Sequence, residues 1–189
     1  MNVYISFLIG FIFLNAQTAS LPKNAPISVL SSIKTVDIKH TSEISTFDPT
    51  WVDSLSLSLP CYGIPVPKRT MRLPNAPRNY RNGTHRGLDF FANWGTPVRS
   101  VADGIVVRSD LHYEEVPADF RENLLKATTK VGYTPSDIFN SVLLGKSVFL
   151  DHGFDLIPGF RTISIYAHLS HLEKEIVPGA VVKRGELLG

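Results

Sequence analysis

Cysteine, long apolar runs and charge of one sign are all scarce in this 189-residue sequence. Cys61 is the only cysteine, which excludes an intramolecular disulfide and a metal site built from several thiolates, and we expect it to be a buried, inert thiol. No apolar run reaches the roughly 20 residues of a membrane-spanning helix. The net charge of +2 gives no global case for a nucleic-acid partner. These absences indicate a globular protein with no nucleic acid among its partners.

The longest uncharged apolar run lies at the start of the chain. Val3 to Leu14 has the length of a signal-peptide core, and small and polar residues follow it. No lysine or arginine precedes the run, and Ala19 and Ser20 are poor cleavage sites, so a short membrane anchor is the alternative. A buried core element is disfavoured because we expect nothing nearby to cover it. The sequence predicts an exported protein of the periplasm or cell envelope, with residues 1–19 as signal peptide or short anchor and no other stable membrane span.

Composition divides the rest of the chain into two parts. Residues 20–70 form an extension rich in Ser, Thr and Pro, in which Ser54 to Pro60 alternates as an edge strand does. In residues 71–189, short runs of β-branched and aromatic residues are separated by Gly, Asp, Asn and Pro. This pattern predicts a mainly β, antiparallel domain. At about residues 115–145 the apolar spacing becomes helical, which predicts a short two-helix insertion.

Local signals place the two helices of this insertion. The first has an apolar stripe at spacings of four, three and four residues, made of Phe120, Leu124, Ala127 and Val131. Thr134 to Asp137 matches a capping box with proline at the first position of the second helix. Gly145 is expected to end that helix.

Basic residues are concentrated before the main β segments. Between Lys68 and Arg86 the chain has six of them and no acidic residue: Lys68, Arg69, Arg72, Arg78, Arg81 and Arg86. Such a stretch attracts an anionic polymer such as a cell-wall glycan. A solvated loop with its counter-charges elsewhere in space is the alternative, and the more common one.

His85 and Asp89 are the first candidate metal ligands. Zinc accepts both imidazole nitrogen and carboxylate oxygen at about 2 Å. Residues four apart in a straight strand lie roughly 13 Å apart, so convergence needs a bent segment, with Gly87 at the bend. Alone, such a pair is more often a hydrogen-bonded surface couple than a pair of ligands.

The segment from Thr162 to His168 is the second candidate. Alternation along a strand puts Thr162, Ser164, Tyr166 and His168 on one face. A row of hydroxyls ending in a histidine is unlike a core face and predicts the floor of a polar groove, with Tyr166 binding substrate. An exposed sheet face with an incidental histidine is the alternative.

Five segments in fixed order resemble the LytM/lysostaphin family of zinc metallopeptidases. They are LPNAPRNYRNGTHRGLDF, GTPVRSVADGIVV, SVFLDHG, IYAHLS and VPGAVVKRGELLG, which together span about Leu73 to Gly189. The resemblance implies an antiparallel sheet of the lysostaphin-like type, the duplicated hybrid motif, lining a groove. It implies one zinc ion held by His85 and Asp89. His168 would be catalytic, acting beside the metal on the water or on the developing oxyanion.

The resemblance also implies a function. Family members cut peptide bonds in the cross-links or stem peptides of bacterial peptidoglycan, so we expect a zinc-dependent endopeptidase with zinc-activated water as nucleophile and peptidoglycan as partner. A non-catalytic wall-binding or hydrolase-activator module on the same fold is the alternative. The presence of His85, Asp89 and His168 favours the enzyme. A lipoyl-type carrier is excluded because no exposed lysine lies in the expected tight turn.

The chain departs from the family pattern at one place. The family takes a third zinc ligand and a second catalytic histidine from a later His-x-His motif, whereas this chain ends at Gly189. The remaining histidines do not obviously replace that motif: His40, His112, His152 and His171. We therefore expect a C-terminally incomplete metallopeptidase domain that is inactive as it stands.

Overall fold

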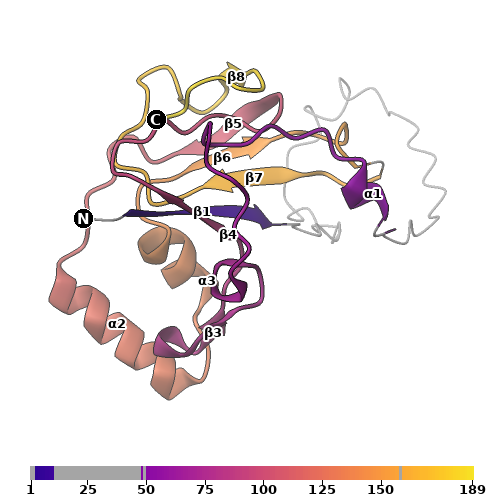
Figure 1. Ribbon diagram of the computed structural model, residues 1–189. Helices are drawn as coiled ribbons and strands as arrows, with labels where there is room; N and C mark the ends of the chain where they lie inside the picture. Colours follow the sequence, from indigo (N-terminus) through magenta and orange to yellow (C-terminus); the bar gives the residue numbers. More distant parts are fainter. Residues whose placement is uncertain (1–2, 11–47, 49, 158) are drawn as a thin grey trace, which may run out of the picture.

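The short β-rich runs of the sequence form a six-stranded antiparallel sheet in the computed structural model, which describes residues 3–10, 48, 50–157 and 159–189 (Figure 1). The strand order is β4-β1-β7-β6-β5-β8. In chain order the bounds are β1 Val3–Gly10, β4 Leu88–Ala92, β5 Gly104–Ser109, β6 Val148–Asp151, β7 Ile163–Tyr166 and β8 Val181–Val182. A second, two-stranded sheet joins β2 Pro77–Arg78 to β3 Gly83–Thr84. The predicted mainly β, antiparallel fold is confirmed.

Apolar side chains cover both faces of the sheet. The first core cluster includes Phe90, Val106, Leu150 and Tyr166, and the second contains Phe139, Leu143, Leu144, Ile165 and Ala167. Successive residues of β7 alternate between the two clusters because side chains along a strand point to opposite faces. Burying a large aliphatic side chain contributes about 1.5–3 kcal/mol, so both clusters hold the sheet in place.

The helical insertion lies on one side of the sheet, with α3 nearer the strands than α2 (Figure 1). Its elements are α2 Ala118–Val131, α3 Ser136–Ile138 and a π-helical turn, η4, Phe139–Leu143. The predicted two-helix insertion and its end at Gly145, where φ is +60°, are confirmed. The helical spacing of the apolar stripe is confirmed, because all four of its residues lie in α2. Phe120 and Val131 are 50% and 57% exposed, since α2 contacts the second core cluster through Leu125 instead.

The extension bonds to the segment between β4 and β5 without forming the predicted edge strand. Within its described part are α1 Thr50–Asp53 and the 3-10 turn η2 Thr70–Arg72. The Ser58 N–H donates to the Val101 carbonyl at 2.9 Å, and the Arg99 N–H donates to the Pro60 carbonyl at 2.8 Å. Cys61 is fully buried in the first core cluster, which confirms its predicted burial, and burial raises the pKa of its thiol. Residues 20–47 and 49 lie outside the described residues.

The N-terminal apolar run supplies a strand inside the main sheet. Strand β1 pairs antiparallel with β4 on one side and β7 on the other, so that Phe7 lies opposite both Leu88 and Tyr166. The expectation that nothing would cover a core element here is therefore wrong. Residues 11–19 of the predicted signal peptide lie outside the described part of the chain, and their removal stays a prediction. Among the described residues, no helix is both long enough and apolar enough to cross a membrane.

Candidate metal centre

The hairpin of β2 and β3 positions His85 just before β4. The His85 N–H donates to the Ala76 carbonyl at 2.7 Å, and the Asn75 N–H donates to the His85 carbonyl at 2.8 Å. In the ring, Nδ1 lies 2.9 Å from the Leu73 carbonyl oxygen. A carbonyl can only accept, so Nδ1 carries the proton and Nε2 presents its lone pair. This Nε2 is buried and has no hydrogen-bond partner among the described residues.

Asp89, on β4, directs one carboxylate oxygen at that lone pair. Its Oδ1 lies 2.9 Å from His85 Nε2, close enough for an ion pair but without the angles of a hydrogen bond. Two buried acceptors that face each other at this distance repel unless a cation lies between them. The pair therefore fits a zinc ion, because imidazole nitrogen and carboxylate oxygen are zinc ligands and a backbone carbonyl fixes the required tautomer.

The bend that brings the two residues together lies between β3 and β4. The bend spans Arg86 and Gly87, which lie between the two candidate ligands, as their four-residue spacing predicts. The residues with positive φ in the described chain do not include Gly87, so the expectation that the bend uses glycine-only backbone angles is wrong.

His168 lies beside this pair, directly after β7. Its φ of +60° is rare for a residue other than glycine and is often found at functional sites. The His168 N–H donates to the Leu144 carbonyl of the insertion at 2.9 Å. Burial lowers the pKa of His168, an effect that the nearby Asp89 carboxylate opposes and that Arg121 and His85 reinforce. The structure thus brings together the predicted ligands His85 and Asp89 and the predicted catalytic His168.

The model of Peptidase family M23 matches residues 83–189, which is more than half of the chain and contains all three of these residues. The chain belongs to Peptidase family M23. At the level of the family it is therefore a peptidase of the metallopeptidase class, and the predicted resemblance is confirmed. No curated protein and no solved structure matches the chain significantly.

Tyr166 does not line a groove in this M23 domain. It is fully buried in the first core cluster, where its hydroxyl accepts from the Val101 N–H at 2.9 Å. Burial raises the pKa of Tyr166. The predicted groove floor on this face of β7 is wrong, since the hydroxyls of Ser164 and Tyr166 are buried and pair with each other. Tyr166 has no exposed surface with which to bind a substrate.

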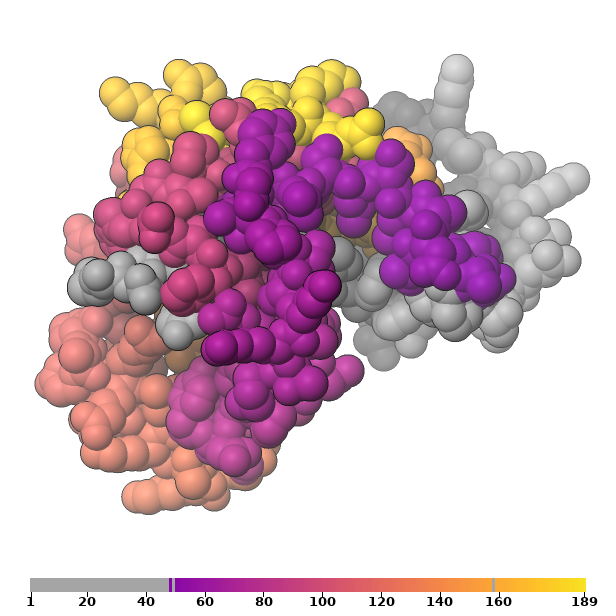
Figure 2. All heavy atoms as spheres, viewed as in Figure 1, coloured from indigo at the N-terminus to yellow at the C-terminus, as the bar shows by residue number. Residues whose placement is uncertain are grey.

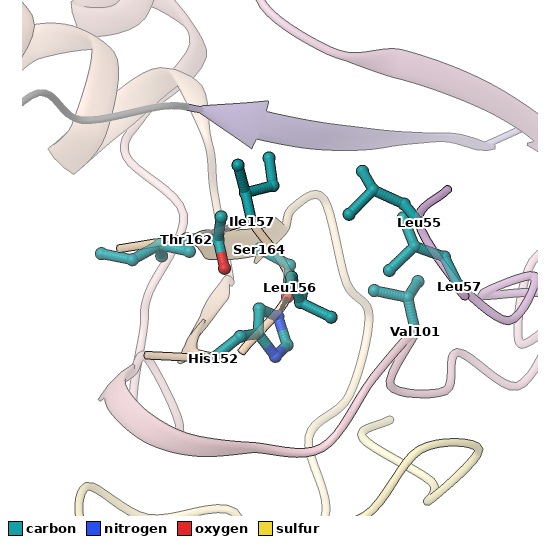
Figure 3. Close-up of a pocket in the computed structure, with 9 residues that line it drawn as sticks. Leu55, Leu57, Val101, His152, Leu156, Ile157, Thr162 and Ser164 are labelled. Atoms are coloured by element: carbon teal, nitrogen blue, oxygen red, sulfur yellow. Dashed lines mark hydrogen bonds between the residues drawn. The ribbon is translucent and has the colours of Figure 1, made fainter. Parts of the chain in front are cut away.

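His152 belongs to the same buried row. Its Nδ1 lies 2.6 Å from the Asp103 carbonyl oxygen, and its Nε2 lies 2.7 Å from Ser164 Oγ, which in turn is 3.1 Å from the Tyr166 hydroxyl. Figure 3 shows His152 and Ser164 beside aliphatic side chains, including Leu156 and Val101. These contacts occupy both ring nitrogens of His152. Within the described residues, no group of three or more His, Cys, Asp or Glu side chains converges as a metal site.

The insertion supports the loop that presents His85, a role that the sequence did not reveal. The guanidinium of Arg81, a buried residue, donates to the Thr84 carbonyl and lies 3.5 Å from Thr134 Oγ1, while the Thr134 hydroxyl donates to the Arg81 carbonyl. The guanidinium of Arg86 lies 4.6 Å from the ring centroid of Phe139. Figure 2 shows this loop segment, in magenta, against the salmon-coloured insertion. The predicted capping box is wrong, because Thr134 bonds to Arg81 and α3 has no side-chain cap.

Contacts within the chain account for the four arginines from Arg72 to Arg86. Arg72 lies 4.6 Å from the Phe91 ring centroid, and Arg78 Nη2 donates to Asp89 Oδ2 at 3.0 Å. Arg81 and Arg86 both stack on Phe139. An Arg over an aromatic face within about 6 Å is a favourable cation–π contact. These contacts favour a structural role for this part of the basic stretch, and binding of an anionic polymer stays a prediction.

Proposed function

We propose that this M23 protein is a zinc-dependent endopeptidase that cleaves the cross-links or stem peptides of bacterial peptidoglycan in the periplasm or cell envelope. One observation carries the proposal: the His85 Nε2 lone pair and the Asp89 Oδ1 atom face each other at 2.9 Å in a buried position. His85 Nε2 is buried without a hydrogen-bond partner among the described residues, which costs about 1–3 kcal/mol unless the lone pair binds something. A single zinc ion accounts for their arrangement.

The chemistry of the site follows from these donors. A zinc ion held by His85 and Asp89 would polarise the scissile carbonyl and lower the pKa of a water molecule toward about 7. His85 keeps its Nδ1 proton on the Leu73 carbonyl, which orients the ring for binding through Nε2. Catalytic zinc sites usually have three protein ligands, so we propose a further ligand from outside the described residues.

His168 is proposed as the proton-transfer residue. Its burial favours the neutral imidazole, the form that can accept a proton near neutral pH. The hydrogen bond to Leu144 holds its backbone in place beside Asp89 and His85. His168 also lines a small pocket together with the turn from Asn93 to Thr96.

The test measures bound zinc and peptide release from purified cell walls with the full-length protein. We expect about one zinc per molecule and release of peptides. His85→Ala and Asp89→Ala should each lose zinc and activity, because each removes one ligand. His171→Ala is the control, since the His171 side chain is exposed and lies close to Glu173 rather than to the candidate metal ligands. Stoichiometric zinc in either ligand variant would remove these residues from the metal site. Wall binding without peptide release would support a non-catalytic module.

A further inference from the structure

Arg78 links the small sheet to the candidate metal ligand on the main sheet. From β2 its Nη2 donates to Asp89 Oδ2 at 3.0 Å and to the Met71 carbonyl at 2.9 Å. The side chains of Arg78 and Asp89 are only 13% and 11% exposed. A charge-assisted hydrogen bond in such a place is stronger than a surface contact.

The two oxygens of Asp89 therefore have different partners. Oδ2 accepts the hydrogen bond from Arg78, whereas Oδ1 lies 2.9 Å from His85 Nε2. Tilting the carboxylate would break the Arg78 contact, so the guanidinium holds the group in the orientation in which one oxygen faces the imidazole. The Met71 carbonyl holds the guanidinium in turn.

We propose that Arg78 is a positioning residue for the metal site, which orients Asp89 so that Oδ1 alone binds the ion and thereby strengthens zinc binding. The inference rests on the proposed zinc site. It identifies a residue that holds a ligand without being one itself.

Two effects of Arg78 on zinc affinity oppose each other. Its positive charge repels a cation, which weakens binding. Its hydrogen bond orients the ligand, and loss of such an outer contact typically costs about 10–100-fold in metal affinity. Because Arg78 contacts the oxygen that points away from His85, we expect orientation to outweigh repulsion.

The experiment measures the zinc dissociation constant of the full-length protein by competition with a chelator. Arg78→Ala should raise it about 10–100-fold, and Arg78→Lys should restore part of the loss, because lysine supplies the charge without the planar fork. Arg161→Ala is the matched control: Arg161 pairs with Asp151 on β6, in another Arg–Asp pair. The Arg161→Ala variant should bind zinc with the same dissociation constant as the parent protein.

A second readout separates positioning from general stability. Cobalt(II) bound in place of zinc reports ligand geometry through its visible absorption, which Arg78→Ala and Arg78→Lys should change and Arg161→Ala should not. Suppose that the parent protein binds zinc and that the folded Arg78 variants bind it equally well or more tightly. That result would overturn this inference and leave the proposed function intact. A parent that binds no zinc would overturn the proposed function itself. If Arg78→Ala does not fold, Arg78→Lys decides between the same outcomes.

Discussion

His168 combines an unusual backbone conformation with a position beside two candidate metal ligands. A left-handed conformation in a residue other than glycine costs about 1–3 kcal/mol and persists only where the surrounding structure enforces it. Here the hydrogen bond from the His168 N–H to the Leu144 carbonyl supplies that support. The conformation also takes the imidazole out of the alternation of β7, so that it does not follow Tyr166 into the core.

We predict that His168→Ala retains zinc and loses peptidase activity by about a hundredfold to ten-thousandfold, the usual contribution of a general acid or base. Zinc content and peptide release, measured on the same sample of full-length protein, check this. The exposed neighbour variant His171→Ala should match the parent in both. Digestion at the parent rate would end the assignment, and loss of zinc would make His168 a ligand.

The sequence predicted those site residues that belong to a local motif. His85, Asp89 and His168 were found because each lies in a short, recognisable segment, and the structure brings them together. Sequence reasoning missed Arg78, because the contact with Asp89 joins two separate sheets and has no sequence pattern. It misplaced Tyr166, because alternation indicates which residues share a face and not what covers that face.

Strand β1 is the element on which the edge of the sheet with the candidate metal ligand Asp89 depends. Within the described residues it is the only strand paired with β4, which carries Asp89. Its residues Phe7 to Gly10 also pair with β7, which leads into His168. Both candidate motifs therefore flank one strand that comes from the far N-terminus of the chain. No local pattern predicts such a pairing, since a run of apolar residues fits a signal peptide equally well.

Phe7→Pro should destabilise the unprocessed chain. Phe7 pairs with residues on both sides, and proline has no N–H to donate in a central strand. An unpaired buried backbone group costs about 1–3 kcal/mol, which denaturant unfolding of protein made without export would detect. Glu114→Pro, in an exposed loop position, is the control. An unchanged free energy of unfolding for Phe7→Pro would show that β1 does not stabilise this sheet.

The helical insertion is the second element that the site depends on. The hydroxyl of Thr134 donates to the Arg81 carbonyl and lies 3.5 Å from the Arg81 guanidinium, which also bonds to the Thr84 carbonyl next to His85. The helical spacing of its apolar residues predicted that this insertion exists. The spacing did not predict its contact with the His85 loop, because the partners lie 53 residues apart in the chain.

Thr134→Val keeps the shape of the side chain and removes these contacts. We expect it to lower the free energy of unfolding by about 1–3 kcal/mol, since it leaves a buried carbonyl and part of a guanidinium without a partner. Thr129→Val is the comparison, because Thr129 is exposed on α2 and its hydroxyl donates to the Leu125 carbonyl of its own helix. Equal stability of the two variants would contradict a supporting role for the insertion.

For the whole molecule, the proposed export processing would remove the residues that form strand β1. A signal peptidase that cuts near residue 20 would remove Val3–Gly10, and β4 would lose its strand partner in the described sheet. Unpaired strand edges promote aggregation, so the processed chain would need another strand at this position.

We predict that protein recovered from the cell envelope starts at about residue 20, as the sequence pattern of a signal peptide indicates. Intact mass and N-terminal sequencing of the exported protein measure this directly. Recovery of a chain that retains residues 3–10 would instead make β1 a permanent strand, and would make the N-terminal run a structural element or an anchor.

His85 and Asp89 are proposed to hold one zinc ion together. Anomalous scattering at the zinc edge, from crystals of the zinc-loaded full-length protein, tests it most directly. We predict one peak at about 2.0–2.2 Å from both His85 Nε2 and Asp89 Oδ1, with Arg78 still hydrogen-bonded to Asp89 Oδ2. A zinc peak away from this pair, with the imidazole and the carboxylate bonded to each other, would contradict it.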